Sequence, residues 1–176
     1  SNARCMNGHF ICDSCHEQMG LRVIEDICRH TDSKDPVAIM KKIILSPYIY
    51  MHGPEHHVLV GSALLAAYKN AGGELDLDAA LEEMRNRGAQ VPGGICGLWG
   101  TCGAAVSTGI FVSLITGASP LSGKEWGLCN EMTSRSLGAI AKTGGPRCCK
   151  RDSYLSIIEA VRFTEEKLGV HMEIKE

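Results

Sequence analysis

The chain has 176 residues, of which 44% are hydrophobic and 22% are charged, and its formal net charge is −2. These values are typical of one globular domain, and the chain is too short for two domains that each have a proper core. Lysine and arginine are scattered along the sequence rather than clustered, which argues against binding to nucleic acid and against a basic membrane-binding face.

The unusual feature of the composition is its nine cysteines and seven histidines. An odd number of cysteines at unequal spacings, with no signal peptide, argues against a secreted disulfide-bonded protein. We therefore expect a cytoplasmic protein that uses its thiols as metal ligands or in redox chemistry. Residues 1–3, Ser-Asn-Ala, look like the remnant of a cleaved expression tag, and we expect native sequence to be missing upstream.

Residues 4–16 are the first element, a Cys/His-rich segment with the pattern of a zinc knuckle. Two cysteines that are two residues apart on a tight turn can direct both thiolates at one tetrahedral ion. The candidate metal ligands in this segment are Cys5, His9, Cys12, Cys15 and His16. The alternative is a set of buried thiols that act as small hydrophobic side chains.

Residues 17–176 predict a single all-α domain, a bundle of about seven helices. Apolar periodicity and helix-boundary signals place these helices near residues 13–30, 36–46, 56–71, 76–87, 102–116 and 122–142, with a last one after 152. Two of them, 56–71 and 102–116, are apolar on all sides and are expected at the centre of the bundle. Ser122 and Asp152 are the expected caps of the last two helices.

Residues 52–57, His-Gly-Pro-Glu-His-His, precede and open one of the buried helices. Consecutive helical residues point about 100° apart, so we expect only one of His56 and His57 to face the same point as His52. A helix N-terminus disfavours imidazolium, which leaves neutral rings that can bind a metal or accept a proton. The alternative is a capping histidine beside a surface one.

Two glycine-framed segments carry the remaining candidate ligands, Cys96 with Cys102 and Cys148 with Cys149. Cys102 is expected at the start of a buried helix, where free N–H groups lower the pKa of a thiol, and the basic residues after Cys149 should act in the same way. Adjacent cysteines can form only a strained disulfide, so shared metal ligation or reversible redox use explains them better. The alternative is close helix packing with inert thiols.

Each of these segments brings polar side chains to the end of a buried helix. We therefore expect the chain after residues 53, 93 and 144 to meet in space. His56, Cys102 and Cys148 would then line one pocket.

Four segments carry long motifs, residues 5–16, 54–60, 91–105 and 144–153. Together they resemble an uncharacterised domain-of-unknown-function family of Cys/His-rich proteins from anaerobic archaea and bacteria. Some relatives in that family are associated with S-adenosylmethionine-dependent methyltransferases, but this chain lacks the glycine-rich methyl-donor fold, so the resemblance does not imply that activity. The Cys102-Gly-Ala-Ala motif and its small-residue helix are also similar to redox families with a Cys-Gly-Ala-x-x-Gly core, although residues 107–109 depart from that spacing.

The sequence thus predicts a metal-binding protein with zinc or an iron–sulphur cluster as the cofactor, because thiolate and imidazole donors favour soft metals. The functional site would draw on His52, His56, His57, Cys96, Cys102, Cys148 and Cys149. In a catalytic site, Cys102 would be the nucleophile or open-site ligand and His56 the base.

Two alternatives stay open. The metal could serve only to hold together an interaction or sensor module, or the protein could be a metal-free thiol–disulfide oxidoreductase. The candidate partners are a second copy of the chain and a methyltransferase or redox protein.

Overall fold

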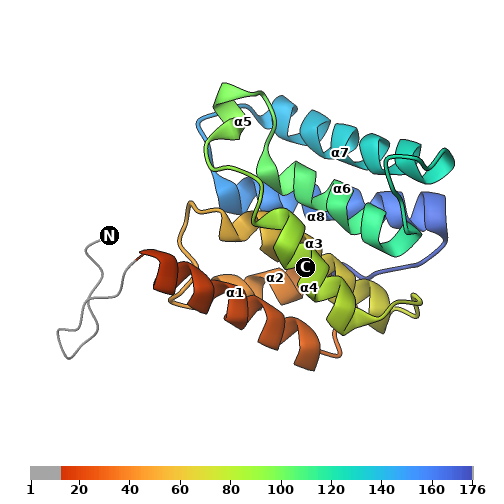
Figure 1. Cartoon of the computed structure of the whole chain (residues 1–176), viewed down its shortest axis with the longest axis horizontal. Helices are drawn as coiled ribbons and strands as arrows, with labels where there is room; N and C mark the ends of the chain where they lie inside the picture. Colours follow the sequence, from red (N-terminus) through yellow and green to blue (C-terminus); the bar gives the residue numbers. More distant parts are fainter. Residues whose placement is uncertain (1–12, 176) are drawn as a thin grey trace.

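The structure is a computed structural model that describes residues 13–175. In this range the chain forms helices and no strands, which confirms the all-α prediction. The helices are α1 (Asp13–His30), α2 (Pro36–Ile44), α3 (Glu55–Asn70), α4 (Leu77–Gly88), α5 (Ile95–Leu98), α6 (Gly103–Thr116), α7 (Lys124–Thr143) and α8 (Cys149–Leu168) (Figure 1).

The described part of the chain therefore has eight helices where the sequence predicts about seven. The addition is α5, a single turn inside a glycine-rich segment that is not among the helices predicted from the sequence. Its N-cap, Gly94, has a φ of 82°, in the left-handed region that glycine adopts without strain. A short turn of this kind leaves no apolar periodicity for a sequence pattern to reveal.

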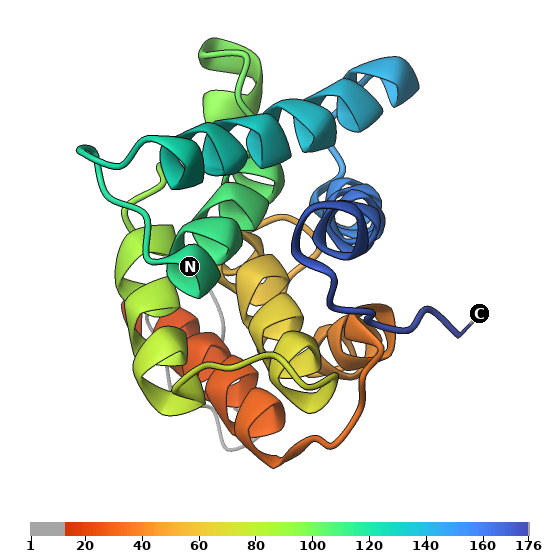
Figure 2. The ribbon, with the colours of Figure 1, turned by 90° about the vertical axis from the view of Figure 1, so that its right-hand side faces the viewer.

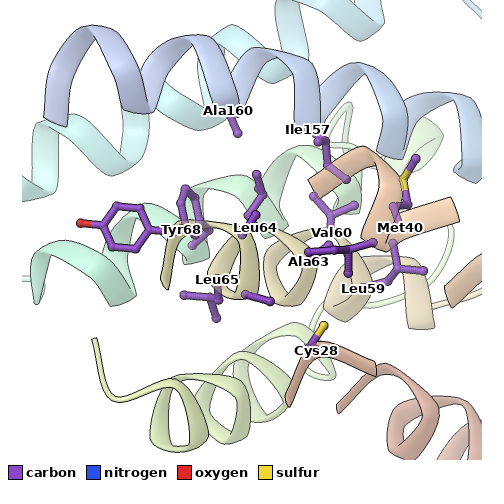
Figure 3. Packing of buried hydrophobic residues seen from close by; sticks show 14 of the residues in the cluster. Cys28, Met40, Leu59, Val60, Ala63, Leu64, Leu65, Tyr68, Ile157 and Ala160 are labelled. Carbon is purple, nitrogen blue, oxygen red and sulfur yellow. The ribbon is translucent and has the colours of Figure 1, made fainter. Parts of the chain in front are cut away.

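Helix α3 is the centre of the fold. It runs between α1, α2, α4, α6 and α8, which surround it in Figure 2. Every residue from 55 to 68 is buried, and Figure 3 shows Leu59, Leu64 and Leu65 pointing to different neighbours. A helix that is covered on all sides has no polar face, which explains its continuous apolar sequence. Cys28 of α1 packs in the same core, and burial raises its pKa to about 12.

Helix α6 packs between α3 and α7 and is less enclosed than expected. Its first part is buried, whereas residues 113–116 are only half-buried. Ser107 Oγ on α6 accepts the N–H of Gly61 on α3 at 2.9 Å. The outer side of α6 is covered by one helix, α7, of which only Met132 and Ser136 are buried. Of the two helices expected at the centre, α3 alone is covered on every side.

Two helix starts differ from the sequence prediction. Helix α7 has Gly123 as its N-cap and no side-chain cap, and the Ser122 hydroxyl instead accepts the N–H of Ser119. Helix α8 starts at Cys149, with Cys148 as its N-cap, so Asp152 lies inside the first turn. Both errors have the same cause, because a residue with a suitable side chain stands close to the actual start without being at it.

Candidate functional site

The starts of α3, α6 and α8 lie at one end of the bundle, on the left in Figure 1, and enclose a cavity of about 380 Å³. The side chains around it that can bind a metal or react come from these helix starts and the loops before them. They are His52, His56, His57, Cys96, Cys102, Cys149 and Asp152. The chain segments after residues 53, 93 and 144 therefore meet, as their glycine-rich sequences predicted.

One expected member of this group is placed elsewhere. Cys148 is the half-buried N-cap of α8 and does not line the cavity. Its neighbour Cys149, the first residue of the helix, lines the cavity instead. Adjacent residues at a helix start point in different directions, so only one of the two thiols reaches the cavity.

The predicted N-terminal knuckle lies mostly outside the described residues, which is the case for Cys5, His9 and Cys12. Cys15 and His16 are in the first turn of α1, where Cys15 is exposed and His16 is buried. The ring of His16 stacks on Tyr50, with 4.1 Å between the ring centroids.

Hydrogen bonds determine the tautomers of His56 and His57. Nδ1 of His56 lies 3.2 Å from the carbonyl oxygen of Gly53, and Nδ1 of His57 lies 3.0 Å from that of Val91. A carbonyl oxygen can only accept, so each Nδ1 carries the proton and each Nε2 carries a lone pair. Within the described chain the buried Nε2 of His56 has no hydrogen-bond partner. A ring held through Nδ1–H with Nε2 available is the usual arrangement of a metal-binding histidine.

Both histidines are neutral near pH 7. Burial lowers the pKa of His56 to about 4, against the opposing effect of its bond to Gly53. Burial also lowers the pKa of His57. The sequence predicts neutral rings for a different reason, the helix dipole. His52, His56 and His57 all line the cavity. That only one of His56 and His57 faces the same point as His52 stays a prediction.

The pKa of Cys102 is shifted in the direction opposite to the prediction. Cys102 is the N-cap of α6, as expected, and the N–H groups of Ala104 and Ala105 lower its pKa. Burial outweighs them and, with Asp152 and Cys96 nearby, raises the pKa to about 11. The Cys102 thiol keeps its proton and directs it at Asp152, with 3.8 Å between Sγ and Oδ2.

The pKa of the Cys149 thiol is also raised. The prediction that the basic residues after Cys149 lower its pKa is therefore wrong as well. Burial raises the pKa of the Cys149 thiol, while the N–H of Gly53 and the Arg147 guanidinium lower it. A negative charge on Cys96 or Asp152 would raise it further. Cys102 and Cys149 are therefore protonated thiols beside the neutral imidazoles of His56 and His57 unless a cation enters.

Asp152 is a site residue whose place in the sequence predicts a different role, the cap of the last helix. Asp152 is 4% exposed, and Nε of Arg151 donates to Oδ1 at 3.1 Å. Oδ2 is thereby left to face the Cys102 thiol. The position of the helix start would have revealed this, because residues three apart share a helix face and α8 begins at Cys149.

A family model described as "Family of unknown function (DUF5714)" matches residues 24–176. The chain belongs to this family. The DUF5714 region contains every cavity residue named above, whereas the knuckle candidates all precede it. Neither the curated proteins nor the solved structures gave a match to the chain.

The structure describes residues 13–175. In that range no three His, Cys, Asp or Glu side chains are arranged to hold one metal ion together. No helix there is both long and apolar enough to cross a bilayer.

Proposed function

We propose that the cavity binds a soft metal ion, zinc or the iron of an iron–sulphur cluster, through His56 and the thiolates of Cys96, Cys102 and Cys149. The observation that carries this proposal is the buried Nε2 of His56, which has a lone pair and no partner in a cavity that three thiols also line. An imidazole with thiolates is a donor set that suits zinc and iron and not magnesium or calcium.

The electrostatics of the thiols support the same conclusion. The pKa values of Cys102 and Cys149 are raised by burial and by the negative charges of their neighbours. A divalent cation offsets both effects, because it supplies the positive charge that a buried thiolate lacks. Binding would therefore release thiol protons, and the affinity for metal should rise with pH.

Metal binding requires the thiols to move toward His56, because the described donors do not surround a common point. Cys96 and Cys102 lie on a segment with the freedom to do so. Gly94 and Gly100 within it both have positive φ values, and Cys96 is only half-buried. Rotation of the cysteine side chains would close the site around His56.

The test is metal analysis of protein purified without oxygen, followed by exchange of the metal for cobalt. Cobalt bound by thiolates absorbs strongly in the near ultraviolet, which reports on the ligands directly. We expect His56→Ala to weaken metal binding by about 10- to 100-fold or more. His30→Ala is the matched control, because His30 is exposed on α1 with Nδ1 bonded to the carbonyl of Asp26.

Metal bound by the N-terminal cysteines has to be separated from metal in the cavity. The Cys102→Ser and Cys15→Ser variants do this. The proposal expects the thiolate–cobalt absorption to fall with Cys102→Ser and to persist with Cys15→Ser. The reverse pattern, or equal binding in His56→Ala and the parent protein, would rule out the cavity as the metal site.

The contact between Cys102 and Asp152 favours a second candidate, metal-free thiol–disulfide exchange. As the sulphur attacks a disulfide substrate, the carboxylate 3.8 Å away would accept the thiol proton. The substrate would be reduced to two thiols and two cavity cysteines oxidised to a disulfide, with the cysteine protons passing to the products. Metal-stripped protein treated with oxidised glutathione should then acquire a disulfide at Cys102, which peptide mapping would detect. No such disulfide is expected if the cavity only binds metal.

A further inference from the structure

We propose that a second cavity, beside the first, binds a small monocarboxylic acid with an apolar body. It has a volume of about 400 Å³ and shares the wall residues Cys96, Cys102, Arg147 and Asp152 with the first cavity. A ligand in it would lie against the thiols. The inference concerns binding alone and stands apart from the proposed metal site.

One wall of this second cavity is apolar. It is formed by Leu137, Ile140 and Ala141 near the end of α7. Gly97, Gly100, Gly144 and Gly145 also line the cavity and contribute no side chains to fill it. The space beside the apolar wall is therefore open to the hydrocarbon part of a ligand.

The charged residues of the second cavity leave one positive charge unbalanced. They are Arg147, Arg151 and Asp152. Arg151 is already engaged, because it donates to Asp152 and to the carbonyl oxygens of Gly144 and Pro146 at 2.9 and 3.2 Å. Arg147 has no ion pair with any described carboxylate.

A carboxylate is the group that this arrangement fits. A guanidinium presents two parallel N–H donors that match the two oxygens of a carboxylate. One excess charge suits a monoanion, whereas a phosphate dianion would be repelled by the nearby Asp152. The apolar wall adds a requirement for a hydrocarbon body, so acetate should be too small.

The test uses hexanoate as the probe and the full chain as the protein, with binding followed by calorimetry or ligand-observed NMR. We expect saturable binding of hexanoate and much weaker binding of acetate, hexan-1-ol and inorganic phosphate. Arg147→Gln should weaken hexanoate binding about 10-fold or more, because a charge-assisted bidentate pair is lost. Lys142→Gln removes a positive charge from α7 outside this cavity and should leave binding unchanged.

Equal hexanoate affinity in Arg147→Gln and the parent protein, or a preference for phosphate, would overturn the inference. Hexanoate should also slow the alkylation of Cys96 by iodoacetamide without slowing that of Cys129, which lies in neither cavity. Lack of this protection would place the ligand elsewhere and equally overturn the inference.

The same titrations with chelator-treated protein separate this inference from the proposed function. Binding of hexanoate is expected with and without metal, because none of the groups argued above needs one. If the protein binds metal but not hexanoate, only the carboxylate site in the second cavity is refuted. If it binds hexanoate but no metal, only the metal site is refuted.

Discussion

His56 is a buried neutral base, and its protonation should make the stability of the fold depend on pH. Its pKa is about 4 in the folded protein and about 6.5 in an unfolded chain. Below pH 6.5 the unfolded chain takes up a proton that the folded protein does not, so the free energy of unfolding falls as the pH is lowered from 6.5 toward 4. Between pH 7 and pH 5 this residue alone should remove about 2 kcal/mol.

Urea unfolding of metal-free protein at the two pH values measures this effect. In His56→Gln the loss between pH 7 and pH 5 should be smaller by about 2 kcal/mol than in the parent protein. His30→Gln, at an exposed position, should keep the full loss. An unchanged loss in His56→Gln would show that the imidazole is not the group that titrates.

Gly103 is the residue against which the ring of His57 packs. A Cβ at this position would overlap the Cδ2 and Nε2 atoms of His57, whose ring is held by its bond to Val91. We expect Gly103→Ala to destabilise the fold by about 2 kcal/mol and to disturb the cavity. Gly138→Ala is the control, since a Cβ there meets nothing within 4 Å and an exposed helical glycine gains up to about 1 kcal/mol on replacement by alanine. A neutral Gly103→Ala would mean that His57 can turn away at no cost.

At the scale of the elements, Asp35 is the cap that ties α2 to the end of the chain. One carboxylate oxygen accepts the N–H groups of Val37 and Ala38 at 2.9 and 3.0 Å, and the other accepts that of Lys175 at 2.7 Å. Asp35 is 2% exposed, so these donors would be left without partners if it were removed.

We therefore expect Asp35→Ala to lower the free energy of unfolding by about 2 kcal/mol or more. Asp76→Ala, which removes an exposed cap with a single bond to the N–H of Ala79, should cost about 1 kcal/mol or less. Chemical denaturation gives both values. Equal losses would show that the contact with the chain end contributes nothing.

The contrast between α2 and the helices at the cavity also explains which element boundaries the sequence could predict. Asp35 followed by Pro36 is a local signal that the structure confirms. Helices α3, α6 and α8 start without a side-chain cap. Without a capping side chain the local signal for these helix starts is missing, and Asp152 was misread as a cap.

At the scale of the whole molecule, a metal ion in the cavity would join three distant parts of the chain. Its ligands come from the start of α3, the segment before α6 and the start of α8. Zinc at 1,000 times its dissociation constant should stabilise the fold by about 4 kcal/mol. For a domain of this size that corresponds to a rise of about 10 °C in Tm.

Thermal melts of chelator-treated protein with and without zinc measure this rise. Cys102→Ser should abolish most of it. Cys129→Ser, at a half-buried position on α7 away from both cavities, should retain it. A zinc-dependent rise that survives Cys102→Ser would point to ligands outside the cavity.

The sequence by itself determined the helical class, the buried course of α3 and the grouping of histidines and cysteines at glycine-rich turns. These follow from apolar periodicity and turn chemistry, which are local properties of the chain. Only the tertiary structure decided that Cys149 rather than Cys148 lines the cavity, that Asp152 faces Cys102, and that Cys102 is a protonated thiol. The pKa of a thiol depends on the balance between local N–H groups and burial by segments about 50 residues away, and the burial is absent from any local pattern.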